Sequence, residues 1–277
     1  MRHALSPSPV GGGSAAEARQ GEGGRGGVLS VTPSRPPAAV DLPPPGGGEA
    51  RSRNRFDITI NSVPLHADPA GALYWPEQGL LAVADLHLEK GSSFAARGQL
   101  LPPYDSAETL ARLAHLIAHY APRTVVALGD NFHDGGGPAR LSDENRWSLR
   151  ALQRGRDWIW IAGNHDPEPA AGVGGAFHET LALGGLTFRH LPSGAHGDIC
   201  GHLHPVARIA HRGRAVSRRC FAADTTRLVM PAFGVFTGGL NVRDAAFADL
   251  FGTLAFTAHM LGADRIYSFA AKRCLGD

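Results

Sequence analysis

Cysteine is scarce in this chain, and the three residues, Cys200, Cys220 and Cys274, are odd in number and widely spaced. Such a set argues against a disulfide framework or a zinc ribbon, and it fits a reducing compartment. No apolar run reaches the roughly 18 residues of a membrane-spanning helix, and no apolar segment follows Arg2 as it would in a secretory signal. We therefore expect a cytoplasmic protein with no membrane partner.

An excess of positive charge is also missing from most of the chain. The formal net charge is +2, and residues 1–55 hold seven of the 27 basic and four of the 25 acidic residues. The remaining residues therefore carry 20 basic and 21 acidic groups and sum to −1. A body so close to neutral has no global positive field typical of nucleic-acid binding. A polyanionic substrate would have to be held by local positive groups, including bound metal ions.

Residues 1–55 differ from the rest in composition, with 11 Gly and 8 Pro. Such a segment cannot bury enough apolar surface to offset the entropy lost on ordering. We expect a disordered Gly/Pro/Arg-rich tail, or a start codon assigned too early. Residues 56–277 are then expected to form a single domain.

Beyond this segment, short apolar runs alternate with helical periodicity. Strands are expected at 56–60, 63–66, 72–75, 80–84, 124–128 and 158–161, and helices at 105–120 and 142–154. Asp105 or Ser106 is the expected N-cap of the first helix, and Ser142 that of the second. Later strands are expected at 178–183, 186–190, 198–201, 207–211, 215–221 and 227–230. This order predicts an α/β layer with a partly parallel sheet, followed by a mixed or antiparallel second sheet.

Polar residues that could bind metal follow five of the expected strands. The clusters are Asp85-Leu-His87, Gly129-Asp130, Gly163-Asn-His-Asp166, His190 and Gly201-His-Leu-His204. Ligands of open α/β sheets bind beyond the carboxyl ends of the strands, so the five clusters should meet at one edge. Residues two apart in extended chain point to one side. Asp85 with His87, and His202 with His204, should therefore each aim two ligands at one site. Oxygen and imidazole ligands without cysteine favour Mn, Fe or Zn.

The order of these clusters resembles the calcineurin-like metallophosphoesterase superfamily, over roughly residues 58–245. Further motifs resemble its ligase-associated DNA damage response endonuclease (PdeM-type) group, which bacteria encode beside a DNA ligase and a helicase. They are Asp85-Leu-His-Leu-Glu-Lys-Gly, Arg97-Gly, Leu101-Pro-Pro-Tyr, Arg219-Cys-Phe, Met230-Pro-Ala-Phe-Gly and Gly238-Gly-Leu-Asn. The resemblance implies a four-layer α/β/β/α sandwich of two mixed sheets, with the metal site at the C-terminal strand ends.

The resemblance also implies a role for each polar cluster. One metal ion would be held by Asp85, His87 and His204, a second by Asn164, His190 and His202, and Asp130 would bridge them. Such a pair of ions lowers the pKa of a bound water, so that a hydroxide attacks phosphorus. Manganese is the expected metal, with Fe, Zn and Mg as alternatives.

Several assignments within this scheme leave an alternative. His190 is chosen as the mid-chain ligand because it ends an expected strand, and His196 is the alternative. His165 is expected to act in catalysis without binding metal, oriented by Asp166. His133 resembles a histidine that contacts the scissile phosphate in nuclease members, and otherwise it is a loop residue that hydrogen-bonds Asp134 or water.

Other basic residues receive weaker assignments. Lys90 and Arg97 follow the first ligands in an expected polar loop and could grip flanking phosphates. Arg140, Arg146, Arg218 and Arg219 are interpreted as surface charges.

These features predict a metal-dependent phosphodiesterase, an endonuclease of bacterial DNA repair that acts on single-stranded or damaged DNA. A small-molecule phosphoesterase for cyclic nucleotides or phosphomonoesters is the alternative, and the near-neutral body favours it. A non-catalytic repair scaffold is a third hypothesis. The complete set of seven candidate ligands argues against that scaffold, because a decayed site usually loses some of them.

Overall fold

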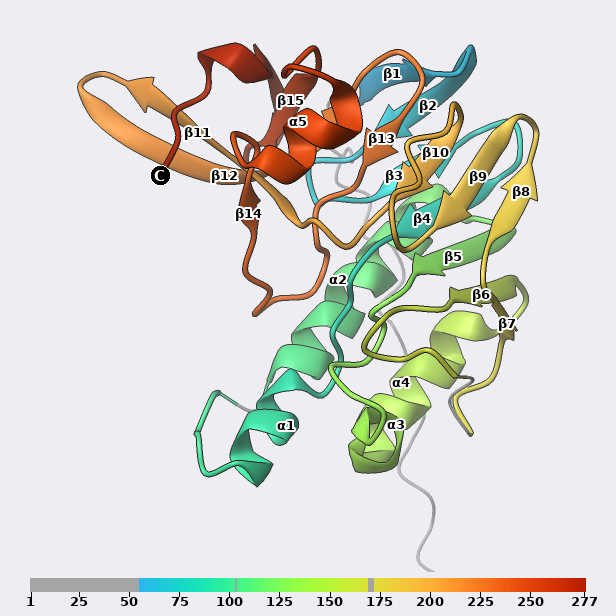
Figure 1. Ribbon diagram of the computed structural model, residues 1–277. Coiled ribbons are helices and arrows are strands. Elements are labelled where there is room, and N and C mark those ends of the chain that lie inside the picture. Colours follow the sequence, from blue (N-terminus) through green and yellow to red (C-terminus); the bar gives the residue numbers. More distant parts are fainter. Residues whose placement is uncertain (1–54, 103, 169–171) are drawn as a thin grey trace, which may run out of the picture. The chain divides into compact units, whose positions relative to one another are not determined.

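The computed structural model describes residues 55–102, 104–168 and 172–277 (Figure 1). The tail expected at 1–55 lies outside the described residues except for Arg55. Cys200, Cys220 and Cys274 are free and buried. No helix in the described part of the chain is both long and apolar enough to cross a membrane.

The first sheet contains seven strands in sequence order. They are β1 (Phe56–Ile60), β2 (Val63–Ala67), β3 (Leu73–Trp75), β4 (Leu80–Val83), β5 (Thr124–Leu128), β6 (Asp157–Ile161) and β7 (Ala176–His178). Strands β1 to β4 are antiparallel, whereas β4 to β7 are parallel. Parallel neighbours need a crossover connection, and α2 (Asp105–Tyr120) and α4 (Asp143–Gln153) provide two of them. The partly parallel sheet is thus confirmed.

The predicted N-cap is confirmed for α4 and wrong for α2. Ser142 caps α4, and its Oγ accepts a hydrogen bond from the Asn145 amide at 3.2 Å. Helix α2 instead has Tyr104 at its N-cap, so the assignment to Asp105 or Ser106 is wrong. Asp105 accepts from the Gly91 amide and Ser106 from the Glu89 amide, at 3.0 and 2.8 Å. These side chains anchor the preceding segment, which forms a further helix, α1 (Lys90–Ala96).

The second sheet contains nine strands and is mixed. They are β8 (Leu181–Leu183), β9 (Leu186–Arg189), β10 (Asp198–Cys200), β11 (Pro205–His211), β12 (Arg214–Ala223), β13 (Leu228–Val229), β14 (Leu240–Asn241), β15 (Thr257–Leu261) and β16 (Ile266–Ala270). The single strand expected at 178–183 is wrong, because its two ends pair in different sheets as β7 and β8. Short helices α3 (Gly137–Arg140), α5 (Ala245–Phe251) and η1 (Ala271–Arg273) were not predicted.

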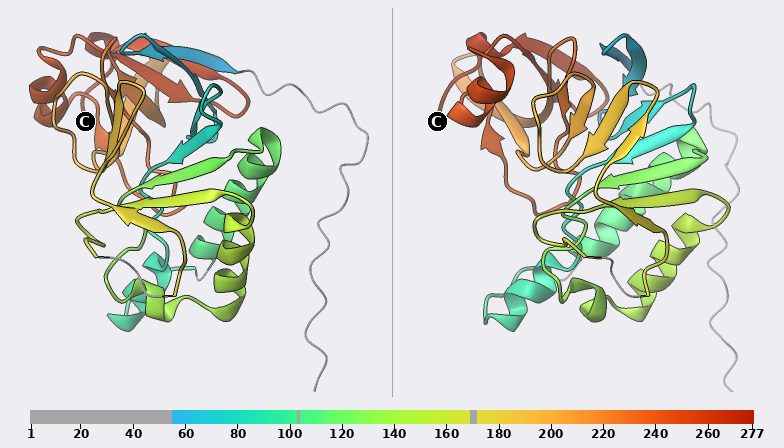
Figure 2. Two further views of the ribbon diagram at one scale, coloured as in Figure 1. Left: turned by 90° about the vertical axis from the view of Figure 1, so that its right-hand side faces the viewer. Right: turned by 45° about the vertical axis from the view of Figure 1, so that its right-hand side comes forward.

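Three apolar clusters fill the spaces between four layers (Figure 2). Leu128 and Ile161 of the first sheet meet Phe188 and Phe221 of the second. Helices α2 and α4 cover the other face of the first sheet through a second cluster, and α5 covers the second sheet through a third. The α/β/β/α arrangement is thereby confirmed.

The first prediction concerns the stability of this fold in acid. His259 on β15 packs on the Phe56 ring at 5.0 Å, and burial lowers its pKa from 6.5 to about 4. Protons therefore bind the unfolded chain first, so the stability present near pH 7 is lost as the pH falls from 6.5 towards 4. We expect the wild type to lose about 1 kcal/mol more than His259→Gln between pH 7 and pH 5, after allowance for partial exposure.

Thermal unfolding of both proteins at the two pH values measures this difference. It corresponds to about 2–4 °C in Tm for a domain of this size. An equal loss of Tm in the two proteins would contradict the assignment.

Candidate metal centre

The loops that follow β4 and β5 run side by side at the edge of the first sheet. The His87 and Leu88 amides donate to the carbonyl groups of Asp130 and Asn131, and the His133 amide donates to the Leu88 carbonyl, each at 2.9 Å. The buried side chains of Leu86, Leu88 and Phe132 hold the loops against the helical layer. This ladder places the Asp85 and Asp130 clusters next to each other.

The expected extended conformation of the ligand pairs is wrong. Asp85, His87, Asp130, His202 and His204 all have positive φ, from 43° to 68°. This left-handed conformation costs a non-glycine residue roughly 1–2 kcal/mol, and such strain is concentrated at functional sites. The turns direct Asp85 and His87 to one cluster, whereas they separate His202 and His204 into two neighbouring ones.

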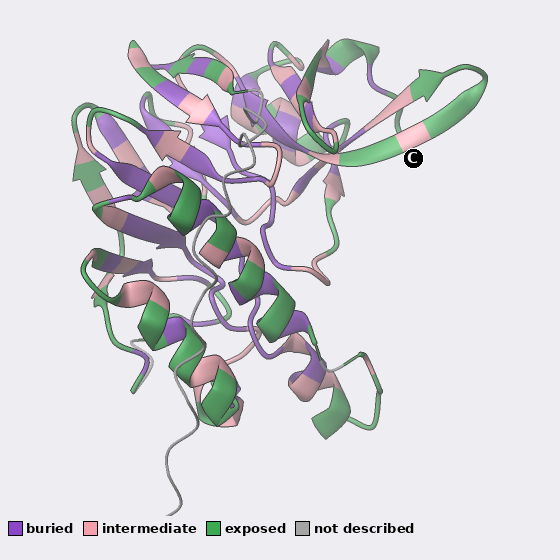
Figure 3. Ribbon diagram, turned by 180° about the vertical axis from the view of Figure 1, so that it is seen from behind, coloured by how far each residue is buried: buried purple, intermediate pink, exposed green. Residues whose placement is uncertain are grey.

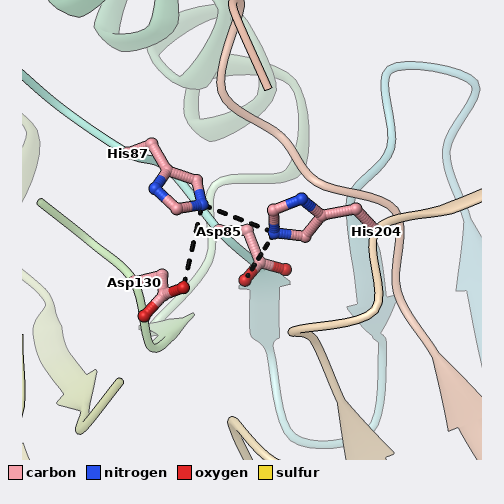
Figure 4. Close-up of side chains that lie close together, drawn as sticks. All are labelled: Asp85, His87, Asp130 and His204. Carbon is pink, nitrogen blue, oxygen red and sulfur yellow. Dashed lines mark hydrogen bonds and ion pairs between the residues drawn. The ribbon is translucent and has the colours of Figure 1, made fainter. Parts of the chain in front are cut away.

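The first cluster contains Asp85, His87, Asp130 and His204, as Figure 4 shows. Its candidate ligand atoms all lie within 4.8 Å of one another. His204 Nε2 is 3.2 Å from Asp85 Oδ1 and 3.4 Å from His87 Nε2. His87 Nε2 in turn lies 3.8 Å from Asp130 Oδ2. Two carboxylates and two imidazoles thus point their ligand atoms at one space.

The second cluster is centred on His190 Nε2. Around this atom lie Asn164 Oδ1 at 2.8 Å, His202 Nδ1 at 3.2 Å and Asp130 Oδ1 at 3.3 Å. The opposite ring nitrogen, Nδ1, is 3.0 Å from the Leu128 carbonyl, which can only accept a hydrogen bond. Nδ1 therefore carries a proton, and Nε2 faces two oxygen acceptors. A cation is favoured at this position, either a second proton on Nε2 or a metal ion, and the donor set fits a divalent metal ion.

Asp130 belongs to both clusters. Its Oδ1 faces His190 and its Oδ2 faces His87, while Oδ1 also accepts from the His165 amide at 2.9 Å. Burial would raise the pKa of Asp130, but its hydrogen bond to His190 and the neighbouring charges hold the pKa below its usual value. An ionised carboxylate with one oxygen towards each cluster is suited to bridge two metal ions.

Two of the imidazole groups, His87 and His202, are held in the neutral state that metal binding requires. Burial and then the neighbouring His204 lower the pKa of His87 to about 3. Burial and then His190 likewise lower the pKa of His202. For His190, burial lowers the pKa, but Asp130 and Asp85 outweigh burial and raise it. Neutral rings offer the lone pairs that metals bind, and His190 would give up its extra proton to the incoming ion.

Three glycines allow the ligands to approach this closely. A Cβ on Gly163 would lie 2.0 Å from the Asp130 amide nitrogen, and one on Gly201 would lie 2.5 Å from Asp85 Oδ2. Gly129 has φ +71°, and its Cβ would lie 2.5 Å from the His190 ring. Only glycine leaves the space that the two carboxylates and the His190 ring occupy.

The second prediction follows from this crowding. Gly163→Ala is expected to displace Asp130 and to lower metal-dependent phosphoester hydrolysis at least about tenfold, because sub-ångström misplacement at a site is costly. Gly135→Ala is the matched control, since a Cβ there meets nothing within 4 Å. Metal content and the rate of diester hydrolysis measure the effect. Equal rates in the two variants would contradict it.

The expected contact between His165 and Asp166 is not found. His165 Nδ1 instead donates to the His133 carbonyl at 2.9 Å, and Asp166 Oδ2 accepts from the Asn131 and Phe132 amides at 2.9 and 3.3 Å. Asp166 therefore supports the Asp130 loop and does not orient His165. Burial raises the pKa of Asp166 to about 6. The His165 side chain is 42% exposed and turns Nε2 towards Asp130 Oδ2, 3.9 Å away.

Helix α1 occupies the segment that was expected to be a polar loop. Its Phe94 ring lies 5.6 Å from the His133 ring, and the Lys90 and Arg97 cations lie 5.8 and 5.5 Å from Phe94. The His133 ring in turn stacks on His165 at 5.5 Å. The structure thus brings His133, Lys90 and Arg97 together beside the first cluster. One hydrogen of Lys90 Nζ is already donated, to the Phe236 carbonyl at 2.9 Å.

Some arginines are structural, contrary to the surface interpretation. Arg219 donates to the carbonyl groups of Ala232, Val235 and Thr237, at 2.9 to 3.3 Å. Arg112, which sequence reasoning missed, donates to the Phe233 carbonyl at 3.0 Å. Together they hold the loop whose Phe233 and Gly234 amides bind the Ala84 and Asp85 carbonyls. The Gly- and Phe-rich run at 230–239 is the sequence feature that could have indicated this loop.

Two further arginines are also held within the fold. Arg140 pairs with Asp134 at 2.7 Å, and Arg146 donates to the Pro138 carbonyl at 2.8 Å. The surface interpretation of Arg218, in contrast, agrees with its exposed position. His196 is exposed and belongs to neither cluster, whereas His190 lies at the centre of the second.

Comparison with known proteins places this site in a family. The calcineurin-like phosphoesterase family model matches residues 80–219, about half of the chain. The Pseudomonas putida nuclease MPE is similar in structure, with a TM-score of 0.62 and 28% identity over 78% of this chain and 100% of that one. The E. coli phosphoesterase Yfce gives a TM-score of 0.36 and 16% identity over 69% and 98%. No curated protein matches the sequence significantly. The chain belongs to the calcineurin-like phosphoesterase family and is a phosphoester hydrolase.

Proposed function

We propose that this calcineurin-like phosphoesterase is a metal-dependent phosphodiesterase that cuts DNA internally, as a cytoplasmic repair endonuclease. The observation that carries the proposal is the pair of ligand clusters that share Asp130, with His133 and His165 stacked at their rim. Similarity to a nuclease at 28% identity supports DNA as the substrate class. Association with a DNA ligase and a helicase stays a prediction.

The candidate ligands divide between two divalent ions, most simply manganese. Asp85, His87 and His204 would hold one ion, Asn164, His190 and His202 the other, and Asp130 would bridge them. Two such ions lower the pKa of a bound water and clamp the phosphoryl oxygens in an in-line displacement. The ions carry +4 and the two aspartates −2, so the loaded site would attract a phosphodiester monoanion.

Two further residues would contribute: His165 would protonate the leaving group, and Asp166 would support the loop that carries Asp130. His165 Nδ1 is committed to the His133 carbonyl, so Nε2 is the atom that can hold a proton over the site. From there it would protonate the departing alkoxide, typically worth 10²–10⁴-fold in rate. Asp166 would keep the Asp130 loop in place through its two backbone hydrogen bonds.

Helix α1 would hold the DNA strand beside the scissile phosphate. His133, Lys90 and Arg97 surround the Phe94 ring, and their side chains offer nitrogen donors of the kind that contact phosphates. Burial lowers the pKa of Lys90, with Asp105 partly opposing this. Desolvation of that kind would strengthen its pairing with an anion.

A small-molecule phosphoesterase remains the second candidate, because the residues beyond 55 sum to −1. One experiment separates the two. We would incubate the manganese-loaded enzyme with circular single-stranded DNA, a chromogenic diester and a chromogenic monoester, with a chelator as control. Linearised circles and rapid diester hydrolysis are expected. Cleavage of the monoester alone would refute the endonuclease proposal.

A further inference from the structure

Positive charge in this protein is concentrated in the β11–β12 hairpin. Residues 205–219 contain five arginines and no acidic residue. The segment therefore carries +5, and the other residues of 56–277 together carry −6. The overall neutrality of the body hides a local basic arm.

The arm begins at the candidate active site and projects away from it. Strand β11 starts at Pro205, directly after the candidate ligand His204, and pairs with β12 as far as His211 opposite Arg214. Seven residues at about 3.3 Å each give the hairpin a length of roughly 20 Å. Its far end extends beyond the rest of the second sheet and is coloured exposed in Figure 3.

Three arginines of the hairpin are free of acidic partners: Arg212 and Arg214 lie at its tip, and Arg218 lies near its base, opposite Ala207. Arg212, Arg214 and Arg218 are exposed, and no ion pair joins them to any carboxylate of the described residues. Arg212 lies in the tight turn with φ 48°, and Arg214 and Arg218 lie on one face of β12. Arg219 differs, because its guanidinium donates hydrogen bonds to three carbonyl groups of the loop at 230–239.

The hairpin lacks the features of a surface that binds another protein. None of the large exposed hydrophobic residues of the described chain lies between 205 and 219. Protein interfaces have apolar or aromatic centres, whereas sequence-independent nucleic-acid binding rests on arginine and lysine contacts to phosphates. A duplex strand presents a phosphate about every 3.4 Å, so an arm of this length spans several of them.

We propose that Arg212, Arg214 and Arg218 form a second, sequence-independent contact with the DNA backbone, which runs along the hairpin away from the bond that is cut. The inference rests on the proposed function, because it extends the DNA strand from the metal centre along the hairpin. It predicts that part of the affinity for long DNA comes from this arm. A substrate that fills only the metal centre would not reach it.

The test compares two triple variants of equal charge change. Arg212→Gln/Arg214→Gln/Arg218→Gln removes the arm's free charges. Arg123→Gln/Arg150→Gln/Arg154→Gln removes three exposed charges near the edge at which β5 and β6 begin. The kcat/KM for a long single-stranded oligonucleotide is measured from 50 to 200 mM salt, and hydrolysis of a chromogenic diester and Tm are measured alongside.

For the hairpin variant we expect a loss of about tenfold at 50 mM salt and a salt slope smaller by about 2, since each lost contact removes about 0.7 on single strands. Diester hydrolysis and Tm should match the wild type, and the control variant should keep its DNA kinetics. An unchanged salt slope would overturn the proposal and would favour an acidic protein as the partner of the arm. Failure of the wild type to cut DNA would instead refute the endonuclease function.

Discussion

Asp130→Ala is expected to abolish metal-dependent hydrolysis of every substrate, by about 10³-fold or more. No other described side chain belongs to both ligand clusters, and each of its carboxylate oxygens faces a different one. The substitution also leaves the converging imidazoles without their shared negative partner. The purified variant should therefore bind less than two equivalents of metal, measured by elemental analysis beside the rate of diester hydrolysis.

A conservative variant and a remote control make this result interpretable. Asp130→Asn keeps the side-chain volume and can still accept from the His165 amide, but its one remaining oxygen can serve only one cluster. We expect partial retention of metal with nearly complete loss of rate. Asp264→Ala removes a 71% exposed carboxylate and should change neither quantity. Near-normal hydrolysis by either Asp130 variant would show that the carboxylate does not bridge.

His165→Ala should have the opposite pattern, with metal content unchanged and turnover reduced about 10²–10⁴-fold. The ring is 42% exposed and lies outside both clusters, but it directs Nε2 towards the shared carboxylate. If Nε2 donates a proton, the loss should depend on the leaving group. A DNA alkoxide needs protonation, whereas a nitrophenolate leaves readily without it, so the loss on DNA should be the larger.

His196→Ala is the matched control, because His196 is exposed and belongs to neither cluster. It should retain wild-type metal content and rates. Equal losses of His165→Ala on DNA and on a nitrophenyl diester would exclude proton donation and leave only charge stabilisation. Loss of metal from this variant would identify His165 as a ligand.

The order of strands and helices was largely predictable because it rests on local patterns. The apolar runs at β4, β5 and β6 and the spacing of Leu110, Leu113 and Ile117 are visible in short windows of sequence. The errors arose where distant pairing decides the outcome. Nothing between 176 and 183 marks a change of sheet, and Asp105 looks like a helix cap until its bond to Gly91 is known.

The basic hairpin illustrates the same limit for charge. Summation over the chain found a neutral body, and two of the hairpin arginines, Arg218 and Arg219, were interpreted alike as surface charges. Only the pairing of β11 with β12 separates Arg218, which is exposed, from Arg219, which is tied to three carbonyl groups. Net charge therefore said little about where an anion could bind.

The sequence by itself determined the chemical types and the chain order of the metal-binding residues, because each cluster directly follows an apolar strand. The tertiary structure decided how they are used. Side-chain alternation placed His202 and His204 at one site, whereas left-handed turns direct them to different clusters, the division that the family resemblance implied. A carbonyl 32 residues away, at His133, oriented His165 in place of the adjacent Asp166. Such contacts depend on where loops meet in space, and no short window of sequence contains that information.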